Sequence, residues 1–266
     1  MRVTSPPSSP AGILSQESKP RMTNQPTALE LFLARLRLRS PLSSQEEDAI
    51  LALKGSEVKT DAHRDIVRPG QTIDFACLVV DGLAGRFDQL ANGHRQITAL
   101  HIPGDMCDLH SVAVPHTGWG IEALTKTTTL RVAHAPLREL TIQFPAIAFA
   151  FWRDTIADAS ILSKWISALG RRGARARLAH LICEMGIRME QTGLGTRTHF
   201  RLPATQAQLA DVLGLTAVHL NRTLQTLRRD GALFTEGFEV KVSDFNRLSG
   251  IADFDPQYLL LESGAK

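Results

Sequence analysis

The chain has 266 residues, of which 43% are hydrophobic and 21% are charged, and these values are those of a globular protein with one large or two ordinary domains. No run of about 18 apolar residues occurs, which excludes a membrane-spanning helix. The formal net charge is only +3, yet residues 171–250 hold 12 Lys and Arg against 7 Asp and Glu. A basic C-terminal part is expected where that part meets a polyanion, although a solvated basic surface has the same composition.

The three cysteines, Cys77, Cys107 and Cys183, are too few and too widely spaced for a disulfide framework, and none forms the Cys-x-x-Cys pair typical of zinc sites. We therefore expect a reducing, cytoplasmic environment. Residues 1–26 lack the apolar core of a signal peptide and are rich in Ser, Pro and Thr, which predicts a disordered tail. Both Met1 and Met22 fit as the start, because the periodic sequence begins only near residue 27.

Two short helices are predicted next, over residues 27–39 and 43–54. The second begins with Ser43 and Glu46 at the spacing of a capping box. From residue 57 to residue 133 about eight short β-rich pieces alternate with glycine turns, and Asn92-Gly93 is a hairpin signal. This texture predicts a small antiparallel barrel or jelly roll, with pieces such as "ACLVVDGLAGRF", "RQITALHI" and "TTTLRVAH" as its strands.

A single long helix is predicted from Pro145 to Leu169, with the proline suited to its first turn. Steps of four and three residues separate small or apolar side chains along it. This heptad pattern predicts that two copies of the chain pair along the helix, with Ile161 and Trp165 exposed beside the seam. A core helix packed on its own barrel is the alternative. The predicted seam consists of Ala148, Trp152, Thr155, Ala159, Leu162, Ile166 and Leu169.

The sequence Gly170-Arg171-Arg172-Gly173 then marks a hinge. An amphipathic helix through Leu178, Leu181, Ile182 and Met185 is predicted after it, followed by the short strand "THFRLP". Two helices around a tight turn come next, and together they predict a helix-turn-helix. Four residues define this motif. Thr205 caps the first helix and forms a capping box with Gln208, Gly214 suits a left-handed turn, and Thr216 can cap the second helix.

The second helix of this motif has two different faces. Leu220, Leu224 and Leu227 form a buried stripe, and two strands that follow, in "ALFTEG" and "FEVKV", predict a β-wing. Arginine can bond guanine, and asparagine or glutamine can bond adenine, so the outer face suits the major groove of DNA. A plain helical hairpin with a polar surface is the alternative. The outer face holds Val218, Asn221, Arg222, Gln225 and Arg229, and no carboxylate.

This order of barrel, long helix and winged helix-turn-helix resembles the Crp/Fnr family of bacterial transcription regulators. The resemblance covers about residues 29–261 and is most specific in "PGDMCDL", "LADVLGLTAVHLNRTLQTLRRDGAL" and "DFDPQYLLL". It implies an α+β fold with four parts after the tail. These are a sensor barrel over 27–144, a dimerisation helix over 145–170, a winged helix-turn-helix over 171–250 and a C-terminal tail over 251–266.

The resemblance also implies the partners: double-stranded DNA with an inverted-repeat operator, a second copy of the chain, RNA polymerase if the protein is an activator, and no membrane. Arg222 matches the family arginine that reads guanine, whereas Val218 stands where many members have a base-reading glutamate, so a different half-site is expected. The base contacts implied are Ala217, Val218, Asn221, Arg222 and Gln225. The phosphate contacts implied are Thr205, Gln206, Thr216, His219 and Arg229.

The sensor part departs from the cyclic-AMP binders, which carry Gly-Glu and then Arg-Ser after "GD". The matching places hold Asp108-Leu109 and Trp119-Gly120. A carboxylate beside the phosphate and no arginine would make phosphate burial costly, so a degenerate effector pocket is expected. Iron–sulfur members need N-terminal cysteines, and residues 1–76 contain none.

We therefore expect no cofactor and no metal. Control by a small ligand, by haem at the histidines and cysteine near Cys107-x-x-His110 and His116, or by oxidation of Cys183 remains open. No catalytic motif is present, so the chain is not expected to be an enzyme. An enzyme with a nucleic-acid-binding appendage is the remaining different class.

Overall fold

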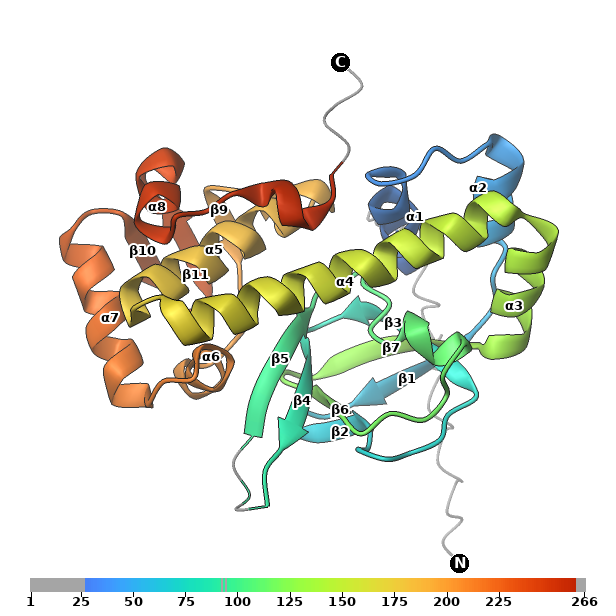
Figure 1. The fold of residues 1–266 in the computed structure, drawn as a ribbon, viewed down its shortest axis with the longest axis horizontal. Helices are drawn as coiled ribbons and strands as arrows, with labels where there is room; N and C mark the ends of the chain where they lie inside the picture. Colours follow the sequence, from blue (N-terminus) through green and yellow to red (C-terminus); the bar gives the residue numbers. More distant parts are fainter. Residues whose placement is uncertain (1–26, 92, 94, 262–266) are drawn as a thin grey trace, which may run out of the picture.

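The structure is a computed structural model that describes residues 27–91, 93 and 95–261. The predicted tail over 1–26, Asn92 of the predicted hairpin turn and residues 262–266 lie outside the described residues. One long helix, α4 (Pro145–Arg171), crosses the molecule, with a two-sheet β-structure along one side and the C-terminal helices at its far end (Figure 1). Among the described helices, none is both long and apolar enough to cross a membrane.

Capping boxes begin the first two helices, and the one predicted at Ser43 and Glu46 is confirmed. The backbone N–H of Ser43 donates to Oε2 of Glu46 over 2.7 Å. These helices, α1 (Ala28–Arg37) and α2 (Ser44–Leu51), share an apolar core with α3 (His134–Gln143) and the first half of α4. The largest fully buried side chains of this core are Phe32, Leu36, Ile50, Leu137 and Ile147.

Two antiparallel sheets form the N-terminal β-structure, which confirms the predicted antiparallel barrel or jelly roll. The strand orders are β1-β7-β3 and β2-β6-β4-β5, so the described part of this N-terminal β-structure contains seven strands where about eight were predicted. Apolar side chains fill the space between the sheets, among them Cys77, Val79 and Ile121. The strands are β1 (Ser56–Thr60), β2 (Arg64–Val67), β3 (Phe75–Asp81), β4 (Ala84–Gln89), β5 (Arg95–His101), β6 (Gly120–Ala123) and β7 (Thr127–Ala133), and the 3-10 helix η1 (Leu109–Val112) lies between β5 and β6.

Helix α4 turns one face toward its own chain, and this face corrects part of the prediction. Ile161 and Trp165 are 3% and 6% exposed, so they belong to the core and do not flank the seam as predicted. The reason is that the helix packs on α1, α3 and the barrel, and both side chains belong to the same buried cluster as those of α5 (Ala174–Gln191). Trp165 also donates its indole N–H to Oε2 of Glu184 on α5, at 2.9 Å.

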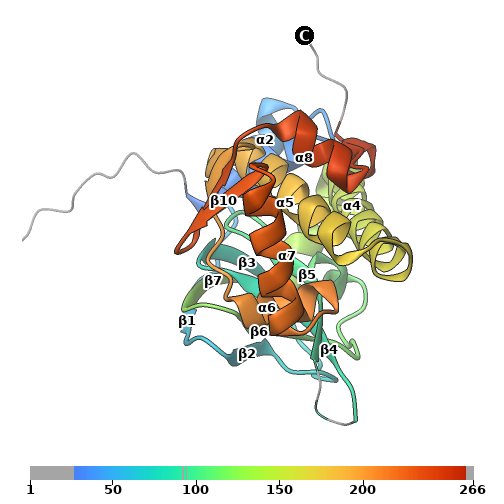
Figure 2. The same ribbon diagram turned by 90° about the vertical axis from the view of Figure 1, so that its left-hand side faces the viewer.

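The C-terminal part contains a compact helical unit with a small sheet, in which α7 faces the viewer in Figure 2. Helix α5 is buried on every side over residues 178–189, so the predicted amphipathic helix is in fact central. The predicted strand and the two wing strands are confirmed in a sheet of order β10-β11-β9-β8. The other elements are β8 (Gly195–Thr196), β9 (His199–Arg201), α6 (Gln206–Leu213), α7 (Ala217–Arg229), β10 (Leu233–Glu236), β11 (Glu239–Val242), α8 (Phe245–Ala252) and the 3-10 helix η2 (Pro256–Leu259).

The two parts of the chain share one continuous apolar core. Leu100 and Leu124 of the barrel belong to the same buried cluster as the side chains of α5, α6 and α7. Helix α6 is fastened at both ends, because Gln208 donates to the carbonyl of Leu124 at 2.7 Å and Gln96 of β5 donates to the carbonyl of Asp211 at 2.6 Å. The helix-turn-helix is therefore held directly against the barrel.

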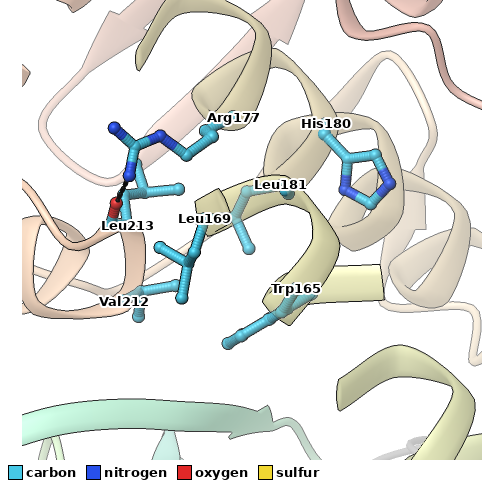
Figure 3. Close-up of a pocket in the computed structure, with 8 residues that line it drawn as sticks. Trp165, Leu169, Arg177, His180, Leu181, Val212 and Leu213 are labelled. Carbon is cyan, nitrogen blue, oxygen red and sulfur yellow. Dashed lines mark hydrogen bonds between the residues drawn. The ribbon is translucent and has the colours of Figure 1, made fainter. Parts of the chain in front are cut away.

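A small cavity of about 20 Å³ marks the place where α4, α5 and α6 meet (Figure 3). Leu169, the last residue of the predicted seam, lines it together with Val212 and Leu213 of α6. Arg177 of α5 closes the junction by donating from Nη1 to the carbonyl of Leu213 at 2.7 Å. The end of the long helix is thus in contact with the helix-turn-helix.

Candidate nucleic-acid interface

The turn between α6 and α7 has the geometry that the sequence predicts. Gly214 has φ +60° and ψ +43°, the left-handed conformation that side chains with a Cβ resist. Gln208 completes the capping box by accepting from the N–H of Thr205 at 2.8 Å, and Thr216 accepts from the N–H of His219 at 3.2 Å. All three caps of the predicted helix-turn-helix are therefore confirmed.

Helix α7 separates its two faces as predicted. Leu220 and Leu227 are fully buried and Leu224 is 5% exposed, which anchors the helix on α5 and α6. On the other side Val218 is 63% exposed, Arg222 and Gln225 are exposed, and Asn221 is half-buried. The packing of the leucines thus fixes which side chains a bound duplex would meet.

The charge of this face is wholly positive, because α7 contains no carboxylate. The Arg222 guanidinium makes no hydrogen bond or ion pair with any described residue, so its donors are available. Arg229 has a weak contact of 3.3 Å with Thr226, whereas Arg228 is used internally, since it bonds Thr235 of the wing. Arg222 is therefore the freest cation on the predicted base-reading face.

The residues predicted to meet phosphates surround this face. Thr205, Gln206, Thr216 and His219 are all exposed, and they lie at the N-terminal ends of α6 and α7. The hydroxyl oxygens of the two threonines accept backbone N–H groups, which leaves their O–H groups to donate. A helix N-terminus with free donors attracts anions, as a phosphate contact requires.

The predicted seam is the second surface of interest. Trp152 and Ile166 are 63% and 60% exposed, although both are large and apolar. Ala159 is also exposed, and the other four predicted seam residues are half-buried. Sequence reasoning missed Phe149 and Ile156, which extend the same exposed apolar face and lie one position from the seam. Large exposed apolar patches mark protein contacts.

A cavity of about 520 Å³ lies between the barrel and α4. Trp119 lines it, as does Arg86 of β4, whose Nη1 is 2.6 Å from Oδ2 of Asp158. Sequence reasoning missed Arg86, because this residue lies on a different strand from the motif that was compared with the cyclic-AMP binders. Thr155, Ala159 and Leu162 of the predicted seam form the opposite wall.

Of the four residues predicted for the degenerate effector pocket, only Trp119 lines this cavity. Asp108 is buried and points elsewhere, since its Oδ1 accepts the backbone N–H of Cys77 at 2.6 Å. Leu109 lines only a smaller neighbouring void, and Gly120 is packed against Phe87. The physical reason is that the turn after "PGD" bonds back to β3, which draws Asp108 away from α4.

Two buried groups near the cavity have shifted pKa values. Burial raises the pKa of Asp108 to about 7, against which the bond from Cys77 lowers it only in part. Burial lowers the pKa of His101 to about 4, and its Nε2 has no hydrogen-bond partner among the described residues. A carboxyl and an imidazole that both favour their neutral forms make the barrel interior less charged than its composition implies.

Control by a metal, by haem or by oxidation would depend on the cysteines and on His110 and His116. All three cysteines are free and buried, and burial raises the pKa of Cys183 to about 12. His110 contacts the ring of Trp119 at 5.3 Å, while Nδ1 of His116 lies 3.4 Å from the hydroxyl of Thr72. Among the described residues no three His, Cys, Asp or Glu side chains lie where they could hold a metal ion.

Comparisons with known proteins agree with this geometry. Residues 176–251 match the Crp-like helix-turn-helix domain. The chain is 29% identical over 196 residues to the transcriptional activator protein FnrL of Cereibacter sphaeroides, covering 70% of this chain and 76% of that protein. It is 24% identical over 241 residues to the transcriptional activator protein FnrA of Stutzerimonas stutzeri, covering 90% and 98%. The solved structure of FixK2 from Bradyrhizobium japonicum superposes with a TM-score of 0.68 at 26% identity, covering 75% and 98%.

The fold and the interface together define a DNA-binding transcription regulator with an N-terminal β-domain of the kind that serves as a sensor. The relatives named above are transcription regulators rather than enzymes. Residues 176–251 thus form a Crp-like helix-turn-helix domain, and the chain is similar over most of its length to FnrL, FnrA and FixK2.

Proposed function

We propose that the protein acts as a homodimer in the cytoplasm and binds an inverted-repeat operator, with one α7 helix in each of two major grooves. We also propose the division into a sensor domain over 27–144, a dimerisation helix over 145–170, a DNA-binding domain over 171–250 and a tail over 251–266. The single observation that carries the proposal is the exposed, carboxylate-free face of α7 beside the capped turn at Gly214.

The base contacts proposed are the exposed residues Ala217, Val218, Arg222 and Gln225 and the half-buried Asn221. Arg222 supports this orientation because its guanidinium is free and projects away from the leucine stripe. Val218 has no polar atom and would contribute apolar contact, as with a thymine methyl. The phosphate contacts proposed are Thr205, Gln206, Thr216, His219 and Arg229.

Selection of bound duplexes from a random pool tests the proposal. We expect an enriched inverted repeat whose half-site centres lie about one helical turn apart. Arg222→Ala should cost on the order of 1–3 kcal/mol and relax the preference at one base pair of each half-site. If the variant lowers affinity for the operator and for a scrambled duplex by the same factor, Arg222 is a phosphate contact and the proposed helix orientation is wrong.

The dimer proposal rests on the exposed apolar face of α4. Trp152 stacks on Phe149 with ring centroids 6.2 Å apart, and both rings are more than half exposed. Ile156 and Ile166 continue this face along the helix, so a second copy would bury a strip about five turns long.

The cavity between Trp119, Arg86 and Asp158 supports a second candidate, control by a small ligand. The Arg86 guanidinium is already paired with Asp158, so a cyclic nucleotide would have to compete with Asp158 for this cation. We propose that cyclic AMP does not bind in the family's usual mode. Calorimetric titration with cyclic AMP checks this, and binding at micromolar concentration would contradict it.

We further propose that a dimer bound near a promoter contacts RNA polymerase. Two of the relatives are named transcriptional activators, which supports an activating role. Run-off transcription from a promoter that carries the selected operator tests this. Increased transcript with the protein supports activation, whereas decreased transcript would show repression.

A further inference from the structure

Three side-chain amides form a hydrogen-bonded relay from α6 to α7. Nδ2 of Asn221 donates to Oε1 of Gln206 at 3.1 Å, and Nε2 of Gln225 donates to Oδ1 of Asn221 at 2.9 Å. Gln206 is the first residue of α6, while Asn221 and Gln225 lie one turn apart on α7. The relay therefore runs from the predicted phosphate contact to the predicted base-reading face.

The two hydrogen bonds fix which end of each amide is used. A side-chain amide has one carbonyl oxygen and two N–H donors. Asn221 is engaged at both ends, because its N–H bonds Gln206 and its oxygen accepts from Gln225. Gln225 uses only one N–H, so its Oε1 and its second N–H have no partner among the described residues.

Adenine is read by an amide that accepts from N6 and donates to N7 at the same time. Gln225 is exposed and has its whole oxygen and one N–H available on one amide, whereas Asn221 is half-buried and already uses one N–H and one lone pair of its oxygen within the protein. We infer that Gln225 reads an adenine, and that Asn221 and Gln206 are positioning residues that hold its amide in the reading orientation. This inference rests on the proposed function and revises the role of Asn221 within it.

The relay has a physical advantage for recognition. A free glutamine side chain on a surface samples many rotamers and loses that freedom when it binds, at a cost of about 1–2 kcal/mol. A side chain already held in the bound orientation avoids part of this loss, which is the general benefit of preorganisation. The i,i+4 spacing of Asn221 and Gln225 favours such a pair on a helix.

Gln206 has a double position in this arrangement. Its oxygen accepts from Asn221, while both of its N–H groups lack a partner among the described residues, and the residue stands at the N-terminus of α6, where a phosphate would bind. A contact between Gln206 and a DNA phosphate would thus hold in place the side chain that orients Gln225 through Asn221. The two roles of Gln206 use different atoms, so they can be separated by substitution.

Two substitutions at this position form a matched pair. Gln206→Glu keeps an oxygen that accepts from Asn221 but replaces the N–H donors with negative charge. Gln206→Lys removes the acceptor, keeps N–H donors for the phosphate and adds a positive charge. Gln206→Glu should weaken binding to all duplexes while the preference for the adenine is retained. Gln206→Lys should keep general affinity while the preference for the adenine is lost.

The experiment measures affinities of the full chain for the selected operator, for its single-base variants and for a scrambled duplex. Gln225→Ala first locates the adenine, whose replacement should cost the wild-type protein roughly tenfold in affinity. Gln206→Lys and Asn221→Ala should both reduce this discrimination to about the level of Gln225→Ala. The double variant Gln206→Lys/Gln225→Ala should then discriminate no less than Gln225→Ala alone, because the two residues act as one unit.

Full discrimination in Gln206→Lys, or in Asn221→Ala, would overturn the relay. Discrimination that survives Gln225→Ala at every position would overturn the assignment of the adenine reader. Binding of the scrambled duplex at low salt shows that each variant is folded. If the wild-type protein enriches no sequence from the random pool, the proposed function itself has failed, and this result is distinct from the others.

Discussion

Arg188 of α5 donates from Nη2 to Oδ2 of Asp105 at 2.6 Å and so joins the C-terminal part of the chain to the "PGD" turn of the barrel. Asp105 is 1% exposed and also bonds Arg35 of α1. Arg35 in turn donates to Asp154 of α4 at 2.7 Å. Elements far apart in sequence thus meet at a single buried carboxylate.

Asp105→Asn should destabilise the protein by about 3–5 kcal/mol, because it removes the carboxylate that two buried guanidiniums share and leaves Arg35 with Asp154 alone and Arg188 with the more distant Glu184. Denaturant unfolding measures the change. Glu190→Gln is the matched control, since Glu190 pairs with Arg197 on the surface and such a pair contributes about 0–1 kcal/mol. Equal effects of the two substitutions would contradict the role of Asp105.

Asp108 should make stability fall as pH rises. Burial raises its pKa to about 7 from an ordinary 3.8, so between these values the folded state binds more protons than the unfolded state. The stabilisation present at low pH is lost as pH rises through about 7. Asp108→Asn stays neutral, so it should raise the melting temperature relative to wild type more at pH 8.5 than at pH 5.

Asp108→Asn must be compared with the wild-type protein at each pH, because burial lowers the pKa of His101 and His180 to about 4. These histidines make stability rise with pH between about 4 and 6.5, opposite to Asp108. Asp61→Asn, at an exposed position, is the control. A difference between Asp108→Asn and wild type that does not change with pH would show that the pKa of Asp108 is not raised.

Trp152→Asp combined with Ile166→Asp should dissociate the proposed dimer. Both side chains are exposed in the protomer, so the substitutions leave its own core intact and place four charges in the paired seam. Sedimentation velocity should show a monomer. Ile142→Asp is the control, since Ile142 is 81% exposed but lies on α3. An unchanged dimer would mean that another surface forms the contact.

Gly214→Ala should harm both stability and DNA binding. A left-handed backbone with a Cβ costs roughly 1–2 kcal/mol, and this Cβ would lie 3.1 Å from Cδ2 of Leu169. Gly193 has a similar φ of +70° with nothing within 4 Å of such a Cβ, so Gly193→Ala measures the backbone term alone. Melting curves and operator affinity should show a larger effect for Gly214→Ala, and equal effects would mean that the contact with Leu169 is unimportant.

Local signals in the sequence predicted the helix-turn-helix well. The caps at Thr205, Gly214 and Thr216 depend on residues three or four positions apart, and the leucine stripe of α7 follows from helical periodicity alone. The same holds for the order of barrel, long helix and wing. Each of these features is decided by neighbours along the chain.

Features decided by distant residues were not predictable. Ile161 and Trp165 fit a dimer flank by spacing, yet α5 covers them. Arg86 reaches the cavity from another strand, and Asp108 turns toward Cys77 because of a backbone bond to β3. No spacing along the sequence encodes these three outcomes, since they depend on how the sheets and helices come together.

The last described helical turn, η2, is bonded to the segment after α1 and to α5, since Nε of Arg39 donates to the carbonyl of Leu259 at 3.0 Å and Tyr258 donates to Glu184 at 2.8 Å. Glu184 further depends on Trp165, and Arg188 on Asp105, so the DNA-binding part takes partners from outside its own boundaries. A fragment cut at the hinge would carry two interior charges stripped of those partners. The parts of the chain follow one another in sequence as separate units, but the stability of the DNA-binding part depends on residues outside it. Joining this part to a different N-terminal domain would therefore require redesign of residues 184 and 188.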